Sequence, residues 1–354
     1  MYRTVLVGLG NVAERIHLPA LKQVPEFQVV AACEPDRERR ERVARAFGIG
    51  ATYDDAPELI AREKPDVVIV GSPPDMHVAH CLASLRGGAH VFCEKPFVET
   101  PADAECVLAA AEAARRLVLI NNQYRYMAMY RESARRLHAG EFGRAFMIQA
   151  WQQMYHPPSS EKNWRAHLIK STLFEFGTHA LDLMCYLFEA LPEAITVEAP
   201  HPRPDIAADV VVGVLLRFPG DRIASMMLNR ISRAPERYFE MRVDAAQGSL
   251  RLSLGGVARA TLDWSKALGR PTGRVSFVKG GEARVESGGR SRVIARESQM
   301  AFASATATHL QEFAMRLNAG DLHQRALRHQ VELIRLVEAG YESARIGQTV
   351  RLAR

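Results

Sequence analysis

The chain has 354 residues, of which 47% are hydrophobic and 24% charged, with a net charge of +6 and a pI near 9.2. A chain of this length is longer than one hydrophobic core usually supports, so we expect two domains. The composition is typical of a soluble globular protein. The positive charges are interspersed, which favours an anionic small molecule as a ligand and argues against nucleic acid. Five scattered cysteines and twelve histidines lack metal-ligand spacing, so we expect no metal. No stretch reaches membrane-spanning length, and a cytoplasmic protein is expected.

The chain begins with a predicted strand and a glycine-rich turn. Residues 2–7 are a short, β-rich and largely apolar run, and Gly8 and Gly10 open a G-x-G-x-x-A pattern ahead of a helix. Gly8 allows a tight turn, and Gly10 lets the backbone approach a pyrophosphate. The phosphate would bind the first N–H groups of the helix, at Asn11 and Val12. The pattern predicts a dinucleotide site.

An acidic residue follows the second predicted strand, residues 27–32. This residue, Glu34, lies about 20 positions after the glycine motif, the spacing of a ribose-binding carboxylate. A carboxylate accepts both ribose hydroxyls and repels a 2′-phosphate, which favours NAD as the cofactor. Arg37 is near enough in the sequence to keep NADP possible.

Strands and helices continue to alternate up to residue 120, which predicts a doubly wound parallel sheet, a Rossmann fold. In the strand expected over residues 66–70, the four residues after Asp66 are an unbroken apolar run, typical of a parallel strand covered on both faces. The strand ends at Gly8, Ser72 and Lys95 should share one edge of the sheet. The other expected elements are strands 90–93 and 118–120 and helices 37–47, 57–63, 102–116 and one opening at residues 75–77.

The segment Cys93-Glu94-Lys95-Pro96-Phe97 follows one of these strands. Because Pro96 cannot continue a sheet ladder, Lys95 should lie at the carboxyl end of the strand, where ligands bind in α/β sheets. A lysine there can polarise a reacting oxygen or move a proton. The alternative is a solvated Lys95–Glu94 pair.

The second half predicts an α+β domain with a large, mostly antiparallel open sheet, because strands follow one another without helices. Such a sheet often pairs between subunits, so we expect a homodimer or homotetramer. The predicted domains are residues 1–122 and 123–354, with the last helix able to pack back on the first domain. The expected strands are 146–151, 209–218, 223–229, 239–245 and 249–254, followed by an irregular or hairpin segment, 267–291, and helices 302–318 and 329–343.

A further helix is expected over residues 173–188. Glu175, His179 and Asp182 would share one of its faces, with Phe176 on the face toward the core. A carboxylate one turn before a histidine orients a general base and raises its basicity. The alternative is a surface hydrogen bond between Glu175 and His179.

Several segments resemble, in the same order, the glucose-fructose oxidoreductase / inositol dehydrogenase / MocA family. They are GLGNVA, SPPDMH, CEKPF, residues 122–126, Trp164-Arg165, residues 177–182 and residues 340–347. The resemblance implies a Rossmann domain followed by an α+β domain that carries the substrate wall. It also implies hydride transfer between a nicotinamide and a carbinol or carbonyl of a sugar, inositol or related polyol.

The resemblance implies roles for individual residues. Lys95 and His179 would be the acid/base pair, with Glu175 beside His179, where the family usually has aspartate. Lys170-Ser171-Thr172 replaces a glycine stretch of the family and is expected to narrow or recharge the pocket. The expected cofactor contacts are Gly8, Gly10, Asn11, Val12, Glu34, Ser72, Pro73, His77, Glu94, Lys95, Gln123 and Arg165. The expected substrate contacts are Lys95, Arg125, Tyr155, Trp164, Lys170 and His179.

Alternatives remain for both function and substrate charge. Some relatives oxidise a sugar transiently, eliminate a substituent and reduce again, so that the outcome is glycoside cleavage. Other relatives are regulatory proteins that sense NAD(H) or sugar, but retention of the lysine and histidine argues against this class. The cations Arg125, Arg165, His167 and Lys170 would suit an anionic substrate, unless the arginines form ion pairs between domains and Lys170 points to water.

Overall fold

The computed structural model describes residues 1–157, 164–234, 236–255, 257–265, 269–278 and 280–352, with the backbone alone for 257–265 and 271–278. The chain forms two compact units. The first combines Met1–Tyr126 with Phe302–Glu342, and the second combines Met127–Ala301 with Ser343–Arg354. This division differs from a single cut after residue 122, because residues 302–342 return to the first unit.

The first unit is built on a six-stranded parallel sheet of order β3-β2-β1-β4-β5-β6. The order reverses between β1 and β4, the point at which open α/β sheets bind ligands. The predicted Rossmann sheet is confirmed, and the short strand β3 is an addition. The strands are β1 (Tyr2–Val7), β2 (Phe27–Cys33), β3 (Ala51–Tyr53), β4 (Val67–Val70), β5 (His90–Cys93) and β6 (Val118–Ile120).

Helices flank this sheet and match most of the predicted ones. The last helix begins at Arg325, four residues before the predicted start. The helical elements are η1 (Ala13–His17), α1 (Leu18–Leu21), α2 (Arg37–Phe47), α3 (Ala56–Glu63), η2 (Pro74–Met76), α4 (His77–Arg86), α5 (Pro101–Ala114), η3 (Gln123–Tyr126), α8 (Ala301–Asn318) and α9 (Arg325–Ile346).

Strand β4 is buried on both faces, as its unbroken apolar run predicts. Val68 and Val70 belong to the cluster on one face, together with residues of α3, α4, α5 and α9. Val67 and Ile69 belong to the cluster on the other face, together with residues of α2 and α8. The two C-terminal helices therefore complete both halves of the Rossmann core.

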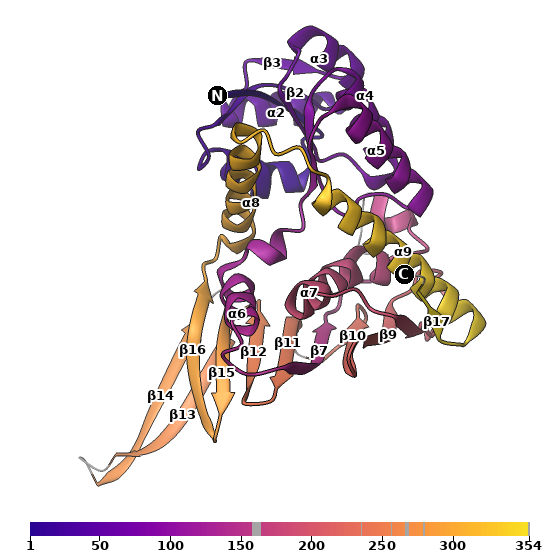
Figure 1. Cartoon of the computed structure of the whole chain (residues 1–354). Helices are drawn as coiled ribbons and strands as arrows, with labels where there is room; N and C mark the ends of the chain where they lie inside the picture. The colour runs from indigo at the N-terminus through magenta and orange to yellow at the C-terminus, as the bar shows by residue number, and fades with distance from the viewer. Residues whose placement is uncertain (158–163, 235, 256, 266–268, 279, 353–354) are drawn as a thin grey trace. The chain divides into compact units, whose positions relative to one another are not determined.

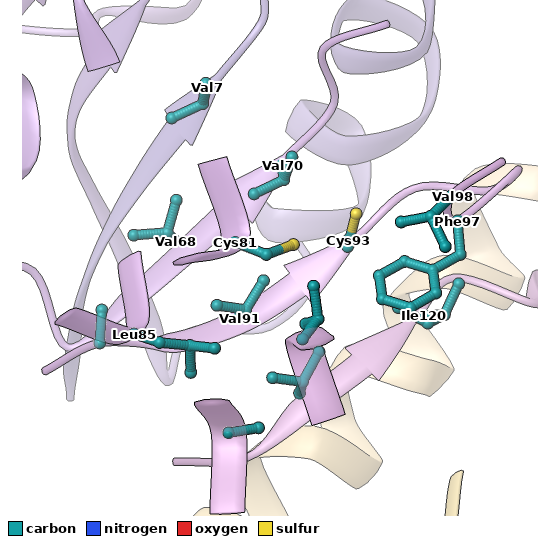
Figure 2. Packing of buried hydrophobic residues seen from close by; sticks show 14 of the residues in the cluster. Val7, Val68, Val70, Cys81, Leu85, Val91, Cys93, Phe97, Val98 and Ile120 are labelled. Atoms are coloured by element: carbon teal, nitrogen blue, oxygen red, sulfur yellow. The ribbon is translucent and has the colours of Figure 1, made fainter. Parts of the chain in front are cut away.

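Two apolar residues that follow the segment CEKP anchor it to this core. Phe97 and Val98 are fully buried and point into the cluster beside Ile120 (Figure 2). Full burial of such a side chain stabilises a fold by about 1.5–3 kcal/mol. The turn that carries Lys95 is therefore fixed to the sheet from its C-terminal side.

The second unit is built on a nine-stranded sheet of order β16-β15-β12-β11-β7-β10-β9-β8-β17. The β7–β10 pair is parallel and the other pairs are antiparallel, which confirms the predicted mostly antiparallel sheet. Strands β13 and β14 form a separate two-stranded sheet. The strands are β7 (Ala145–Gln153), β8 (Ala194–Glu198), β9 (Val211–Phe218), β10 (Arg222–Asn229), β11 (Arg237–Ala245), β12 (Gly248–Leu254), β13 (Val257–Ser265), β14 (Arg270–Val278), β15 (Gly281–Ser287), β16 (Arg290–Glu297) and β17 (Val350–Arg351).

The helices of the second unit, α6 and α7, lie against one face of the large sheet (Figure 1). Outside residues 267–268 and 279, which are not described, the segment 267–291 consists of strands and hairpin turns, the second of the two predicted possibilities. Among the described helices of the whole chain, none has both the length and the apolar character to cross a membrane. The helical elements of this unit are α6 (Ala128–His138), η5 (Trp164–His167), η6 (Thr172–Gly177) and α7 (Thr178–Phe188).

Candidate functional site

The glycine turn after β1 has the geometry of a phosphate site. Gly8 has a φ of +94°, and a Cβ atom there would lie 2.7 Å from the backbone of Gly71 and Ser72, so glycine is required. For Gly10, by contrast, no described atom outside its own stretch of backbone lies within 4 Å of the position a Cβ would take. The turn therefore leaves space beside the first N–H groups of the following helix, at exposed Asn11 and half-buried Val12.

The Glu34 carboxylate lies against this turn. It accepts hydrogen bonds from the backbone N–H of Leu9 at 3.0 Å and of Asp36 at 3.1 Å. A guanidinium nitrogen of Arg39 is 3.4 Å away. Arg37 instead pairs with Glu41 at 2.8 Å. The arginine that reaches the Glu34 carboxylate is thus Arg39, while Arg40 donates to the Glu34 backbone carbonyl. The ribose role of Glu34 stays a prediction.

The strand ends lie level along one edge of the first sheet. The N–H groups of Gly71, Glu94 and Asn121 donate to the last carbonyls of the neighbouring strands β1, β4 and β5, each at 2.8 Å. This ladder confirms that the residues after β1, β4 and β5 share one edge. We call these three residues the strand-end row, and Lys95 directly follows its middle residue, Glu94.

His77 bridges the turns that follow β4 and β5. Its Nδ1 lies 2.7 Å from the carbonyl oxygen of Phe97, and its Nε2 lies 2.8 Å from that of Ser72. Burial lowers the pKa of this histidine, although both carbonyl contacts act in the opposite direction. Ser72 also bonds His80 through its hydroxyl at 2.8 Å, and Pro73 begins the short helix η2. His77 is thus a packed histidine that ties two strand-end turns together, and its contact with the cofactor stays a prediction.

Glu94 and Lys95 differ sharply in burial. Glu94 is 4% exposed, and its carboxylate accepts a hydrogen bond from Asn121 Nδ2 at 2.6 Å. Lys95 is half-buried, its backbone N–H donates to Glu94 at 3.2 Å, and its peptide bond to Pro96 is cis. The pair is therefore not a solvated surface pair, since the carboxylate is directed into the protein.

The segment after β6 supplies a second group of polar side chains. Gln123 is 4% exposed, and its Oε1 atom has no hydrogen-bond partner among the described residues. Arg125 lies 2.5 Å from the imidazole Nε2 of His329, and Asn122 donates to Gln330 at 2.9 Å. Both contacts lie within the first unit. Gln123 Oε1 is a buried acceptor that a ligand amide would satisfy.

In the second unit, the expected amphipathic helix 173–188 is wrong in two respects. Residues 172–177 form a π-helical segment, η6, and α7 starts at residue 178, so the chain does not keep one 3.6-residue period. Glu175, His179 and Asp182 are 3%, 8% and 1% exposed, so the polar face is buried as well. These are buried groups rather than a solvated helix face. Buried polar side chains of this kind need partners.

Glu175 has such a partner in Arg165, whose Nε donates to its carboxylate. The Arg165 guanidinium also lies 4.5 Å from the ring centre of Trp164, a cation–π contact. Both residues of this ion pair belong to the second unit, so Arg165 does not form the ion pair between domains that was the alternative expectation for it. The relay from Glu175 to His179 stays a prediction.

Two residues that the sequence did not single out organise the start of η6. The Asp209 carboxylate accepts from the backbone N–H groups of Ser171 and of Leu173, the latter at 2.9 Å. Arg230 is 2% exposed and donates to the Ser171 hydroxyl at 2.7 Å. Asp209 precedes β9 and Arg230 follows β10, positions at which charged residues are ordinarily solvated. The contacts of these two residues with η6 arise only in the fold.

These contacts correct one expectation about the segment Lys170-Ser171-Thr172. Ser171 and Thr172 are fully buried, and the Thr172 hydroxyl donates to the Asp209 carbonyl, so neither side chain lines an open pocket. Lys170 is exposed. Tyr155 is 50% exposed, and its hydroxyl accepts from Arg233 at 3.0 Å on the surface of the second unit.

The first unit has the features that a nicotinamide dinucleotide needs. The space beside Gly10, the strand-end row and the buried acceptor of Gln123 fit its phosphate and amide groups. Within the described residues, no group of three or more His, Cys, Asp or Glu side chains is arranged to hold a metal ion. The fold and these features define an α/β protein with a dinucleotide-binding domain.

Comparison with known proteins agrees with this class. Residues 2–122 match the profile described as oxidoreductase family, NAD-binding Rossmann fold, and residues 130–251 match the GFO/IDH/MocA C-terminal domain. The chain therefore belongs to the Gfo/Idh/MocA family of NAD-binding oxidoreductases, as the sequence resemblance predicted.

Individual relatives share low sequence identity with this chain but align with most of its length. D-apiose dehydrogenase of Paraburkholderia graminis is 26% identical over 71% of this chain and 68% of its own length. The 1,5-anhydro-D-fructose reductase of Ensifer adhaerens is 27% identical over 71% of this chain and 75% of its own. An oxidoreductase from Agrobacterium radiobacter, solved with NAD+, L-tartaric acid and magnesium, superposes with a TM-score of 0.83, covering 99% and 98% of the two chains at 20% identity.

Proposed function

We propose that this oxidoreductase transfers a hydride between NAD(P) and a carbinol or carbonyl of a sugar, inositol or related polyol. The observation that carries the proposal is the half-buried Lys95 in the strand-end row of a dinucleotide-binding sheet. The names of the relatives support the substrate class, since they include D-apiose dehydrogenase and 1,5-anhydro-D-fructose reductase.

The first unit would hold the cofactor through groups along one sheet edge. The N–H groups after Gly10 would bind the pyrophosphate, and Glu34 would accept the ribose hydroxyls. Gln123 Oε1 would accept from the carboxamide, which would satisfy its otherwise unpaired buried atom. The bound nicotinamide supplies the hydride acceptor or donor. NAD is the expected form, with Arg39 beside Glu34 as the group that would admit a 2′-phosphate.

Lys95 and His179 would act as the acid/base pair. During alcohol oxidation Lys95 would hydrogen-bond the reacting oxygen and stabilise its developing negative charge. His179 would accept the hydroxyl proton, with Glu175 orienting its ring. In the reverse direction the same residues would donate to the carbonyl oxygen.

Replacing Lys95 tests this assignment. Lys95→Ala should lower kcat about 10²–10⁴-fold, the loss typical of a positioned acid/base group, with the NAD dissociation constant within a few-fold of wild type. Lys22→Ala removes an exposed lysine and serves as the control. Near-full turnover by Lys95→Ala with NAD still bound would refute the role of Lys95.

The substrate class is tested by a spectrophotometric screen of sugars, polyols, uronates and glycosides with NAD and NADP. We expect neutral sugars or polyols to be preferred, because the charge of Arg165 is already balanced by Glu175. NADH should accumulate in proportion to product. Release of an aglycone without NADH would instead indicate oxidation, elimination and reduction within one turnover.

A homo-oligomer formed through the nine-stranded sheet completes the proposal. On the face opposite α6 and α7, Leu215, Ile223 and Met227 are 50%, 42% and 53% exposed on the adjacent strands β9 and β10. Exposed apolar patches of this kind favour association. Met227→Asp should dissociate the oligomer in light scattering, and the melting temperature should then no longer depend on protein concentration. A monomeric wild-type protein would refute the interface.

A further inference from the structure

The Glu34 carboxylate joins two turns at the edge of the parallel sheet. One is the glycine turn after β1, and the other leads from β2 into α2. Glu34 is 6% exposed. Its Oε2 accepts from the backbone N–H of Leu9 at 3.0 Å, and its Oε1 accepts from that of Asp36 at 3.1 Å. We call these two hydrogen bonds the Glu34 bridge.

Leu9 lies within the glycine turn, between Gly8 and Gly10, and is fully buried. The N–H of Gly8 donates to the carbonyl of Cys33 at 2.9 Å, so two successive N–H groups tie the turn to the end of β2. A buried N–H that loses its acceptor destabilises the fold. The turn therefore depends on the Glu34 carboxylate for its second contact with the end of β2.

The position of Glu34 is fixed by its backbone. Its N–H donates to the carbonyl of Tyr53 in β3 at 3.0 Å. Its carbonyl accepts from the guanidinium of half-buried Arg40, which also donates to the carbonyl of Pro35 at 3.2 Å. The Glu34 bridge therefore begins from a residue whose backbone is held on both sides.

The Glu34 carboxylate has few acceptor sites left for a ligand. A carboxylate offers about four lone-pair sites. The Glu34 bridge takes two of them, and Arg39 Nη1, which lies 3.4 Å from Oε1, takes a third. About one site therefore remains for the ribose, on Oε2. Accepting both ribose hydroxyls would withdraw the carboxylate from a backbone N–H.

We propose that Glu34 is a positioning residue for the pyrophosphate site, beyond the ribose contact proposed for it above. The Glu34 bridge holds Leu9 in place, and with it the turn that leads to the N–H groups of Asn11 and Val12, before the cofactor binds. A preformed site binds more tightly because less ordering is needed on binding. The effect on cofactor affinity rests on the pyrophosphate placement proposed above, whereas the bridge is a property of the chain without cofactor.

Two substitutions test the Glu34 bridge in the ligand-free protein. Glu34→Ala removes both acceptor oxygens. Glu34→Asp keeps the carboxylate but is one methylene shorter, so it can accept from the N–H two residues on and cannot reach that of Leu9 as well. This milder change keeps the test decisive where Glu34→Ala does not fold.

Both variants should loosen the glycine turn. The Leu9 amide should exchange with deuterium at least about tenfold faster than in the wild type, measured by NMR, because its hydrogen bond is lost. The melting temperature should fall by about 3–8 °C. Glu38→Gln removes an exposed carboxylate from α2 and serves as the control, which should change neither value.

Calorimetry with two ligands separates the turn from the ribose. The ligands are NAD and the analogue of NAD that contains 2′-deoxyadenosine. An aspartate still suits the ribose, since dinucleotide sites use either acid at this position. Glu34→Asp should therefore weaken the binding of both ligands by the same factor, about tenfold, because the loss arises in the turn.

The outcomes distinguish this inference from the proposed function. Unchanged Leu9 exchange in both variants, undiminished NAD affinity in Glu34→Asp, or a loss of affinity that disappears with the 2′-deoxy analogue would each overturn the inference. Faster exchange with equal losses for the two ligands supports it. If those results come with no hydride transfer to or from any screened substrate, the inference stands and the proposed function alone is refuted.

Discussion

Replacing Gly8 by alanine should destabilise the first unit by about 3 kcal/mol, since two separate costs add at this position. The backbone φ of +94° is one that L-residues rarely adopt. The new Cβ would also lie 2.7 Å from the carbonyl carbon of Gly71 and the nitrogen of Ser72, well inside ordinary contact distance. Because the obstacle is backbone at the end of β4, it cannot turn aside as a side chain would.

The expected loss of about 3 kcal/mol combines the cost of the backbone conformation with the cost of the close Cβ contact. An unfavourable backbone conformation costs about 1–3 kcal/mol, and forced displacement of packed atoms costs a similar amount. For a unit of this size, about 3 kcal/mol corresponds to a fall of roughly 6–12 °C in melting temperature. The assay is differential scanning calorimetry of the wild-type and variant proteins without ligand.

Gly10→Ala is the matched comparison. Its Cβ would enter space that no described atom occupies, and its φ is not positive, so the melting temperature should stay the same or rise slightly. The same methyl group would occupy the space proposed for the pyrophosphate. NAD affinity by calorimetry should therefore fall at least about tenfold, a loss of about 1.4 kcal/mol. An unchanged melting temperature for Gly8→Ala would refute the packing argument, and unchanged NAD affinity for Gly10→Ala would refute the phosphate placement.

Three further predictions concern the supports of the site. Phe97→Ala removes a fully buried anchor and should cost about 3–5 kcal/mol, measured by the melting temperature. Asp209→Asn replaces a carboxylate that accepts two backbone N–H groups and should cost about 2 kcal/mol, whereas exposed Asp205→Asn should leave the melting temperature unchanged. The pKa of Glu94 is lowered in the folded protein, so its stabilising contribution is present above its unfolded pKa and is lost as the pH falls through its folded pKa. Glu94→Gln should thus flatten the acid decline in melting temperature, and an unchanged decline would contradict the buried anion.

Most of the Rossmann sheet could be predicted from local patterns. The run Val67–Val70 is apolar without interruption because both of its faces are covered, and this leaves a clear trace in the sequence. The Gly8 and Gly48 turns likewise follow from the positive φ that glycine permits. Strand β3 is not predicted, because its three residues, Ala51–Tyr53, are too few to show a period and, unlike Val118–Ile120, do not form an apolar run.

The helix that carries His179 shows where such patterns fail. Spacing of 3.6 residues places Glu175 and His179 on a polar face, but the π-helical segment η6 changes the period, and that face is buried together with most of the helix. Asp209 and Arg230 fix the start of that segment from positions far along the chain. No local signal distinguishes such residues from solvated ones, because their partners are set by tertiary packing.

The sequence by itself determined the dinucleotide-binding fold and the position of Lys95 at a strand end, because glycine geometry, apolar periodicity and the proline after Lys95 act locally. The tertiary structure decided what surrounds these residues. It directs the Glu94 carboxylate inward to His17 and Asn121, and it pairs Glu175 with Arg165. The difference is physical, since the charge state and orientation of a buried side chain depend on partners that the fold brings from distant segments.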